Sequence, residues 1–197
     1  MAIEPAVVNL PTIYQNAAYS VQMRLTDRLR PATITSTGVI SCPCHGLAVG
    51  AKVVLLSQLP TASLCGAVLN QVYYVSPLEF SASTIRLTTA LIGGNVLNIT
   101  GAGDQQFFVA QPVDITNYVI DADICKKQTN IRVQVATFAC TIDTAVDGAF
   151  SLKLTPSSSL AIAADEYAYD VSMTPSNGDR FYAVRGEVPV AVTRSRT

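Results

Sequence analysis

A chain of 197 residues that is 49% hydrophobic and only 14% charged, with a formal net charge of −1, lacks the basic surface that neutralises nucleic-acid phosphates. It also lacks an uninterrupted apolar run of the ~20 residues that span a bilayer. We therefore expect a globular protein that binds neither nucleic acid nor a membrane. The start, Met1-Ala2-Ile3-Glu4-Pro5, has no basic region followed by an apolar one, which predicts synthesis in the cytoplasm without export.

The first predicted strand stops early, and a similar pattern resumes much later. Its alternating apolar positions are Val21, Met23 and Leu25. Period-two alternation is typical of a strand with one buried face. The intervening stretch instead has short apolar runs separated by Gly and Pro, and the longer alternation returns after Pro112. Insertions are tolerated in exposed loops whose ends lie close together. We therefore predict one β domain of residues 1–30 plus 110–197, interrupted by a second β domain of residues 31–109.

The insert is predicted to be a small barrel-like or roll-like β domain. Short strands separated by Gly and Pro turns are expected at 32–35, 52–56, 71–75, 83–87, 95–100 and 106–109. Its full charges are Lys52, Glu79, Arg86 and Asp104. Interface cores are depleted in charge, so the insert is a candidate packing module. The alternative is a small domain kept soluble by Ser, Thr, Asn and Gln.

Two aromatic pairs in the insert place one ring on each face of their strands, so one ring of each pair is a candidate for contact with a partner. The carboxy-terminal tail adds two arginines that could reach an acidic neighbour. The candidate interface residues are Tyr73, Tyr74, Phe107, Phe108, Arg194 and Arg196. The alternative is that the aromatics belong to the core and the terminus is frayed.

The outer domain continues with alternating strands at 119–124, 131–136, 150–154, 167–173 and 181–192. The turns between them are too short for crossover helices, which predicts antiparallel pairing and an all-β sandwich. In the last strand, one face is expected to carry Tyr182, Val184, Gly186, Val188, Val190 and Val192. Residues 156–166 break the pattern and predict a short helical turn that buries Leu160 and Ile162.

Residues suited to catalysis or metal binding are few. The cysteines are Cys42, Cys44, Cys65, Cys125 and Cys140, an odd number without an export signal, so reduced thiols are expected. Cys42-Pro43-Cys44-His45 would be a metal cluster only with a second paired set, which the insert does not supply. His45 is the only histidine, and no triad can be assembled around it. Asp121 and Asp123 share a strand face where solvated residues are expected, and Asp165-Glu166 begin a strand, so neither pair indicates acid and base catalysis. We expect no enzyme, metal or cofactor.

Turn-and-strand phrases stand out in both predicted domains, for example 45–53 and 71–75 in the insert and 112–118 and 185–190 in the outer domain. These phrases resemble those of tailed-bacteriophage virion proteins. The insert is similar to a small β module that recurs in them, on the residues 37–40, 45–53, 59–60, 71–75 and 83–87. The outer domain is similar to immunoglobulin-like phage structural proteins, including the amino-terminal domain of baseplate upper proteins, on the residues 9–17, 112–118, 147–150, 166–170 and 185–190. That family has glycine where this chain has Asn117, which can also adopt a left-handed turn conformation.

The resemblance implies an immunoglobulin-like antiparallel β-sandwich interrupted by a small barrel or roll. It also implies a structural virion protein, synthesised in the host cytoplasm and present as a homo-oligomer or in many copies. We expect a tail or baseplate adaptor that joins a fibre or peripheral component to the tail, with edge strands that add to a neighbour's sheet. The alternatives are a capsid or neck decoration protein and a receptor- or carbohydrate-binding module.

Overall fold

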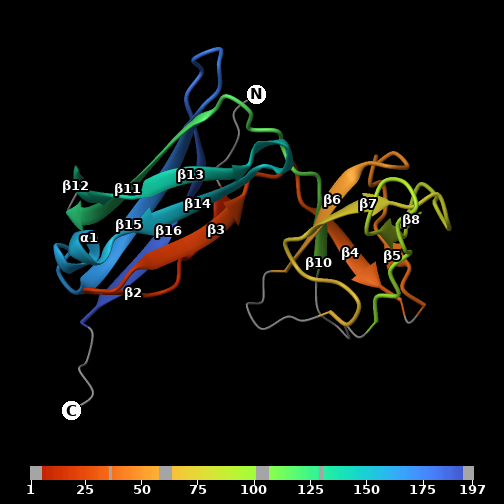
Figure 1. The fold of residues 1–197 in the computed structure, drawn as a ribbon, viewed down its shortest axis with the longest axis horizontal. Helices are drawn as coiled ribbons and strands as arrows, with labels where there is room; N and C mark the ends of the chain where they lie inside the picture. The colour runs from red at the N-terminus through yellow and green to blue at the C-terminus, as the bar shows by residue number, and fades with distance from the viewer. Residues whose placement is uncertain (1–5, 36, 58–63, 101–106, 129–130, 193–197) are drawn as a thin grey trace. The chain divides into compact units, whose positions relative to one another are not determined.

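The computed structural model describes residues 6–35, 37–57, 64–100, 107–128 and 131–192 (Figure 1). The protein is nearly all β, with 53% strand and 5% helix, in agreement with the predicted fold class. No helix in these ranges has the length and hydropathy of a membrane span. The chain divides into two compact units, Met1–Leu25 with Asp114–Thr197 (unit 1) and Thr26–Val113 (unit 2). The expected insert, 31–109, lies within unit 2.

Unit 1 is a sandwich of two sheets. The larger has the order β1 (Ala6–Val7), β16 (Phe181–Ala191), β15 (Asp165–Thr174), β11 (Val119–Gln128) and β12 (Ile131–Thr137), with β2 (Ile13–Tyr14) also paired to β16. The smaller has the order β13 (Ala139–Thr144), β14 (Ala149–Leu154) and β3 (Tyr19–Arg24). The first two strands run parallel to β16, and the remaining pairs are antiparallel. This is the connectivity of an immunoglobulin-like sandwich.

The core of unit 1 follows the predicted alternation along β15, where Tyr167, Tyr169, Val171 and Met173 are all buried. The prediction for β16 is wrong at both ends, because Tyr182 is 55% and Val192 61% exposed. At the first of these positions the cause is a register shift: Val171 pairs with Val184 and Ser172 with Tyr182, so Ala183 is skipped. A bulge of this kind turns the side chains beyond it to the other face of the sheet.

A short helix and a tyrosine close the connection from β14 to β15. Thr155 is the N-cap of helix α1 (Pro156–Leu160), and its hydroxyl accepts a hydrogen bond from the backbone N–H of Ser158 at 3.1 Å. Ile162 is buried as predicted, but Leu160 is 57% exposed, so the prediction for that residue is wrong. The hydroxyl of Tyr167 donates to the carbonyl of Ala163 at 3.0 Å, which forms the tyrosine corner of immunoglobulin-like domains.

Unit 2 is a sheet that nearly closes on itself. All of its pairings are antiparallel. The order is β8 (Thr84–Ile85), β5 (Ile40–Ser41), β4 (Arg30–Ile34), β10 (Phe107–Ala110), β6 (Lys52–Ser57), β7 (Val72–Val75) and β9 (Leu87–Thr88). The strands at the two ends of this order are separated in the chain by Arg86 alone, so one continuous segment joins both edges. The result is a nearly closed barrel, and this arrangement reduces the free sheet edge.

The chain enters and leaves unit 2 at adjacent positions. Thr26 and Pro112 form an antiparallel bridge. The N–H of Asp27 donates to the Gln111 carbonyl at 2.9 Å, and the N–H of Gln111 donates to the Asp27 carboxylate at 2.7 Å. The two ends of the unit are therefore held side by side, which is the geometry that insertion into a host domain requires.

Candidate interaction surface

The four aromatic residues proposed for contact differ in their exposure to solvent. Tyr73 is 2% exposed and Phe107 is fully buried in unit 2, so a partner cannot reach either ring. The Tyr73 hydroxyl is occupied as well, because it accepts from the N–H of Val68 at 2.7 Å. Tyr74 and Phe108, one residue further along, are half-buried and present part of each ring to solvent. The two arginines, Arg194 and Arg196, lie outside the described residues.

Other apolar side chains in unit 2 are far more exposed. Val49 is 47%, Leu91 61% and Ile92 88% exposed. A Cβ placed on Gly50 would lie 2.9 Å from Leu91 Cδ1, so the Leu91 side chain folds back against the turn that contains Val49. We call Val49, Leu91 and Ile92 the apolar loop patch. Exposed apolar side chains grouped on one surface are typical of an interaction site.

Charge is scarce around this barrel and is largely neutralised within it. Arg86 pairs with Glu79 at 2.7 Å. Arg30, which is 8% exposed, forms two hydrogen bonds to the Asp27 carboxylate, at 2.7 and 2.9 Å, and donates its Nε–H to the His45 carbonyl at 2.7 Å. A buried guanidinium needs this complete set of acceptors. The surface of unit 2 therefore favours a neutral partner over a highly charged one.

His45 has a structural role in unit 2. Its side chain is buried, Nδ1 accepts from the N–H of Leu47 at 2.9 Å, and Nε2 lies 2.7 Å from the Ser81 carbonyl, to which it must donate. Phe80 packs edge-on against the ring at 5.5 Å between centroids. Cys42 is buried, and burial raises the pKa of its thiol. Among the described residues, no three His, Cys, Asp or Glu side chains are grouped to hold a metal ion.

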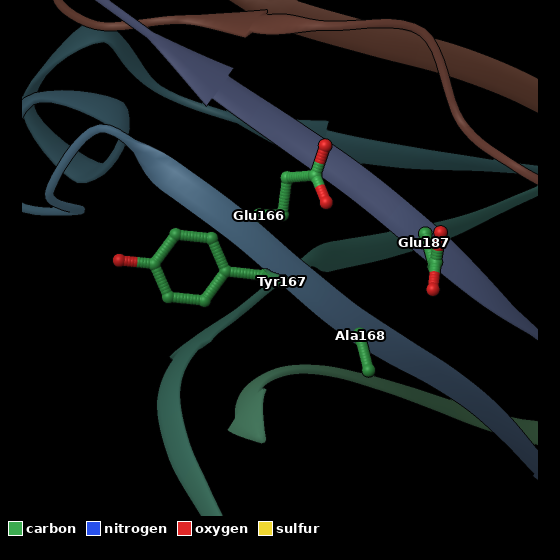
Figure 2. Close-up of a pocket in the computed structure, with 4 residues that line it drawn as sticks. All are labelled: Glu166, Tyr167, Ala168 and Glu187. Atoms are coloured by element: carbon green, nitrogen blue, oxygen red, sulfur yellow. The ribbon is translucent and has the colours of Figure 1, made fainter. Parts of the chain in front are cut away.

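The surface hollow in unit 1 lies on β15 and β16 and has a volume of about 140 Å³. The hollow is lined by Glu166, Tyr167, Ala168 and Glu187, and Figure 2 shows the Tyr167 ring directed away from the two glutamate side chains. Both glutamates are exposed to solvent, and the structure does not arrange them as an acid and base pair. This hollow can attract a cationic group but has no catalytic geometry.

Two other acidic residues of the six-stranded sheet, Asp123 and Asp165, are engaged in local contacts. Asp123 Oδ1 accepts from Gln134 Nε2 at 2.8 Å and from the Thr137 hydroxyl at 3.1 Å. Lys126 pairs with Asp165 at 2.7 Å, and this hydrogen bond, with a smaller contribution from a backbone N–H, lowers the pKa of the Asp165 carboxyl. These acidic side chains are thus bonded to neighbouring residues of the sheet.

Two of the open sheet edges of unit 1, those at β12 and β13, are interrupted. Strand β12 ends the six-stranded sheet, and its pairing with β11 skips Val135 between Gln134 and Ala136. Strand β13 ends the three-stranded sheet, and its pairing with β14 skips Asp143. Bulges twist an edge away and disfavour pairing with another chain. Strand addition at these edges is therefore limited to a few residues on either side of each bulge.

Comparison with known proteins adds no relative: no protein-family model matches the chain, and no curated protein matches its sequence.

Proposed function

We propose that the protein is a structural component of a tailed-bacteriophage virion, a tail or baseplate adaptor that joins a fibre or peripheral component to the tail by protein packing. The proposal rests on the phage-like sequence phrases together with one structural observation. That observation is a barrel with an exposed, charge-poor apolar loop patch, carried as an insert in an immunoglobulin-like sandwich. Such a module presents contact area without catalytic groups.

The proposed contact uses loops and barrel surface more than strand addition. The bulges of β12 and β13 restrict continuous pairing at two of the open edges of unit 1. The apolar loop patch is the alternative source of binding free energy, since burying apolar surface contributes roughly 25 cal/mol per Å² before the costs of association. Repeated copies in one particle would multiply a weak single contact.

The test begins with the copy number and position of the chain in purified particles, measured by quantitative mass spectrometry and labelled-particle electron microscopy. A few copies at the tail end support the adaptor. Hundreds over the head would instead assign the chain to capsid decoration, and absence from the particle would remove the structural proposal.

A paired substitution tests the contact surface. Ile92→Asp changes a side chain that is 88% exposed, so we expect the free energy of unfolding to change by no more than about 0.5 kcal/mol while incorporation into particles falls. The matched control is Val146→Asp, at a 53% exposed position on the turn before β14 in unit 1. Equal incorporation of both variants would exclude the apolar loop patch as the contact.

A further inference from the structure

The turn between β15 and β16 holds the only Asn-Gly pair in the sequence, Asn177-Gly178. Both residues are exposed. The N–H of Gly178 donates to the Pro175 carbonyl at 2.9 Å, and Gly178 has a φ of 86°, which glycine adopts without strain. An atom placed at the missing Cβ of Gly178 would meet nothing within 4 Å, so no neighbouring group crowds that side of the glycine.

The Asn177 side chain is held over this backbone by the residue that follows the glycine. Its Oδ1 accepts from the N–H of Asp179 at 3.2 Å, and its Nδ2 donates to the Asp179 carboxylate at 3.0 Å. The first of these bonds makes an Asx turn. The ring that it closes contains both Asn177 Cγ and the backbone nitrogen of Gly178, so the two atoms are kept close in space. Such proximity is what accelerates an intramolecular reaction.

We propose that Asn177-Gly178 is a site of spontaneous covalent modification, in which the asparagine side chain is converted to aspartate and isoaspartate. The backbone nitrogen of Gly178 loses its proton and attacks Asn177 Cγ. A C–N bond forms, the bond from Cγ to Nδ2 breaks, and Nδ2 leaves as ammonia, which gives a five-membered succinimide. Water then adds to either ring carbonyl and opens it to aspartate or to isoaspartate.

The Asp179 backbone N–H has a further role in this step. It already donates to Asn177 Oδ1, the atom on which negative charge develops when the nitrogen attacks Cγ. A fixed donor at a developing oxyanion lowers the barrier to acyl transfer. The hydrogen bond from Gly178 to the Pro175 carbonyl opposes the reaction, because it must open before the nitrogen can attack.

A second pair in the chain provides an internal comparison. Asp147-Gly148 could form the same ring, but Gly148 is buried. Its N–H donates to the Ala145 carbonyl at 3.0 Å, and its own carbonyl accepts from the N–H of Leu25 at 2.9 Å. With both backbone groups of the glycine held inside the sandwich, the nitrogen cannot rotate toward the aspartate side chain. The structure therefore selects the exposed turn for reaction and excludes the buried one.

Modification would alter the turn in two ways. The bond from Asn177 Nδ2 to the Asp179 carboxylate would be replaced by two carboxylates facing each other. Isoaspartate also adds a methylene to the main chain, which is incompatible with the present bond from Gly178 to Pro175. Arg180 is the residue after Asp179, and its guanidinium donates to Ser172 Oγ at 2.7 and 3.0 Å. A change in the turn therefore also affects the residues of β15 and β16 next to it.

The experiment incubates the folded chain at mildly alkaline pH and maps its peptides by mass spectrometry, with the free peptide 173–182 treated in parallel. We expect a gain of about one dalton at residue 177, two chromatographically distinct products, and no change at the other asparagines. Gly178→Val should abolish the gain, because its side chain hinders attack. Asn177 that stays intact in the folded chain while the free peptide is converted would overturn the proposal.

Discussion

The N-terminal segment depends on a glycine in the opposite strand, and Gly186→Ala tests this dependence. An alanine Cβ at position 186 would lie 1.8 Å from the Val8 carbonyl oxygen and 2.6 Å from its carbon. Both are backbone atoms, so no rotamer change relieves the clash and residues 8–10 must move. This movement breaks four hydrogen bonds of 2.6–3.1 Å. Two are backbone bonds, from the N–H of Val8 to Arg185 and from the N–H of Leu10 to Glu187. The other two run from the Tyr169 hydroxyl to the Val8 carbonyl and from the Glu187 N–H to the Asn9 side chain.

At about 1 kcal/mol for each of these hydrogen bonds, Gly186→Ala should lower the free energy of unfolding by about 4 kcal/mol. Urea unfolding followed by circular dichroism measures the loss. The matched control is Gly178→Ala, where φ is 86° but nothing lies within 4 Å of the new Cβ, so only about 1 kcal/mol of backbone strain is expected. Equal losses in the two variants would refute the steric argument.

Three further predictions concern unit 1. The buried Tyr19 hydroxyl has no hydrogen-bond partner among the described residues, so Tyr19→Phe should raise the free energy of unfolding by about 1 kcal/mol. Tyr167→Phe deletes the bond to Ala163 and should lower the free energy of unfolding by about 1 to 2 kcal/mol in the same urea assay. Burial raises the pKa of Tyr19 from 10.0 to about 12, so the stability linked to this group is fully present below pH 10.0 and is lost as the pH rises toward about 12. Tyr19→Phe should therefore move the midpoint of alkaline unfolding to higher pH. An unchanged midpoint would contradict this. Replacing residues 27–111 by a short Gly-Ser link between Thr26 and Pro112 should leave a sandwich with cooperative thermal unfolding, and a chain without a transition would show that unit 1 needs its insert.

Period-two alternation was sufficient to find the strands whose faces are cleanly buried. It predicted Tyr167 to Met173 and the resumption of the sandwich after Pro112. The left-handed conformation expected for Asn117 is also present, with a φ of 64°. These features are local, because side-chain spacing and turn conformation depend on residues close together in the chain.

The features that the sequence did not predict depend on pairing between distant segments. The bulge at Ala183 depends on the register of β15 against β16, and it is what turns Tyr182 outward. Barrel closure through the segment around Arg86 is a relation between both edges of one sheet. The apolar loop patch had a local signal, since two large apolar residues, Leu91 and Ile92, directly precede the pair Gly93-Gly94, which favours a turn, where polar residues are usual.

The bonds at the junction explain how a sandwich can accommodate an entire barrel. On the sandwich side, the N–H of Leu25 donates to Gly148 and the N–H of Ile115 donates to Ala145, both within unit 1. On the barrel side, Asp27 is bonded to Arg30 and Gln111, both within unit 2. Each crossing of the chain is therefore fixed separately in both units. The entropic cost of closing a flexible loop rises only slowly with its length. A folded insert whose ends are adjacent adds even less to this cost, so the barrel acts on the sandwich as a short turn would.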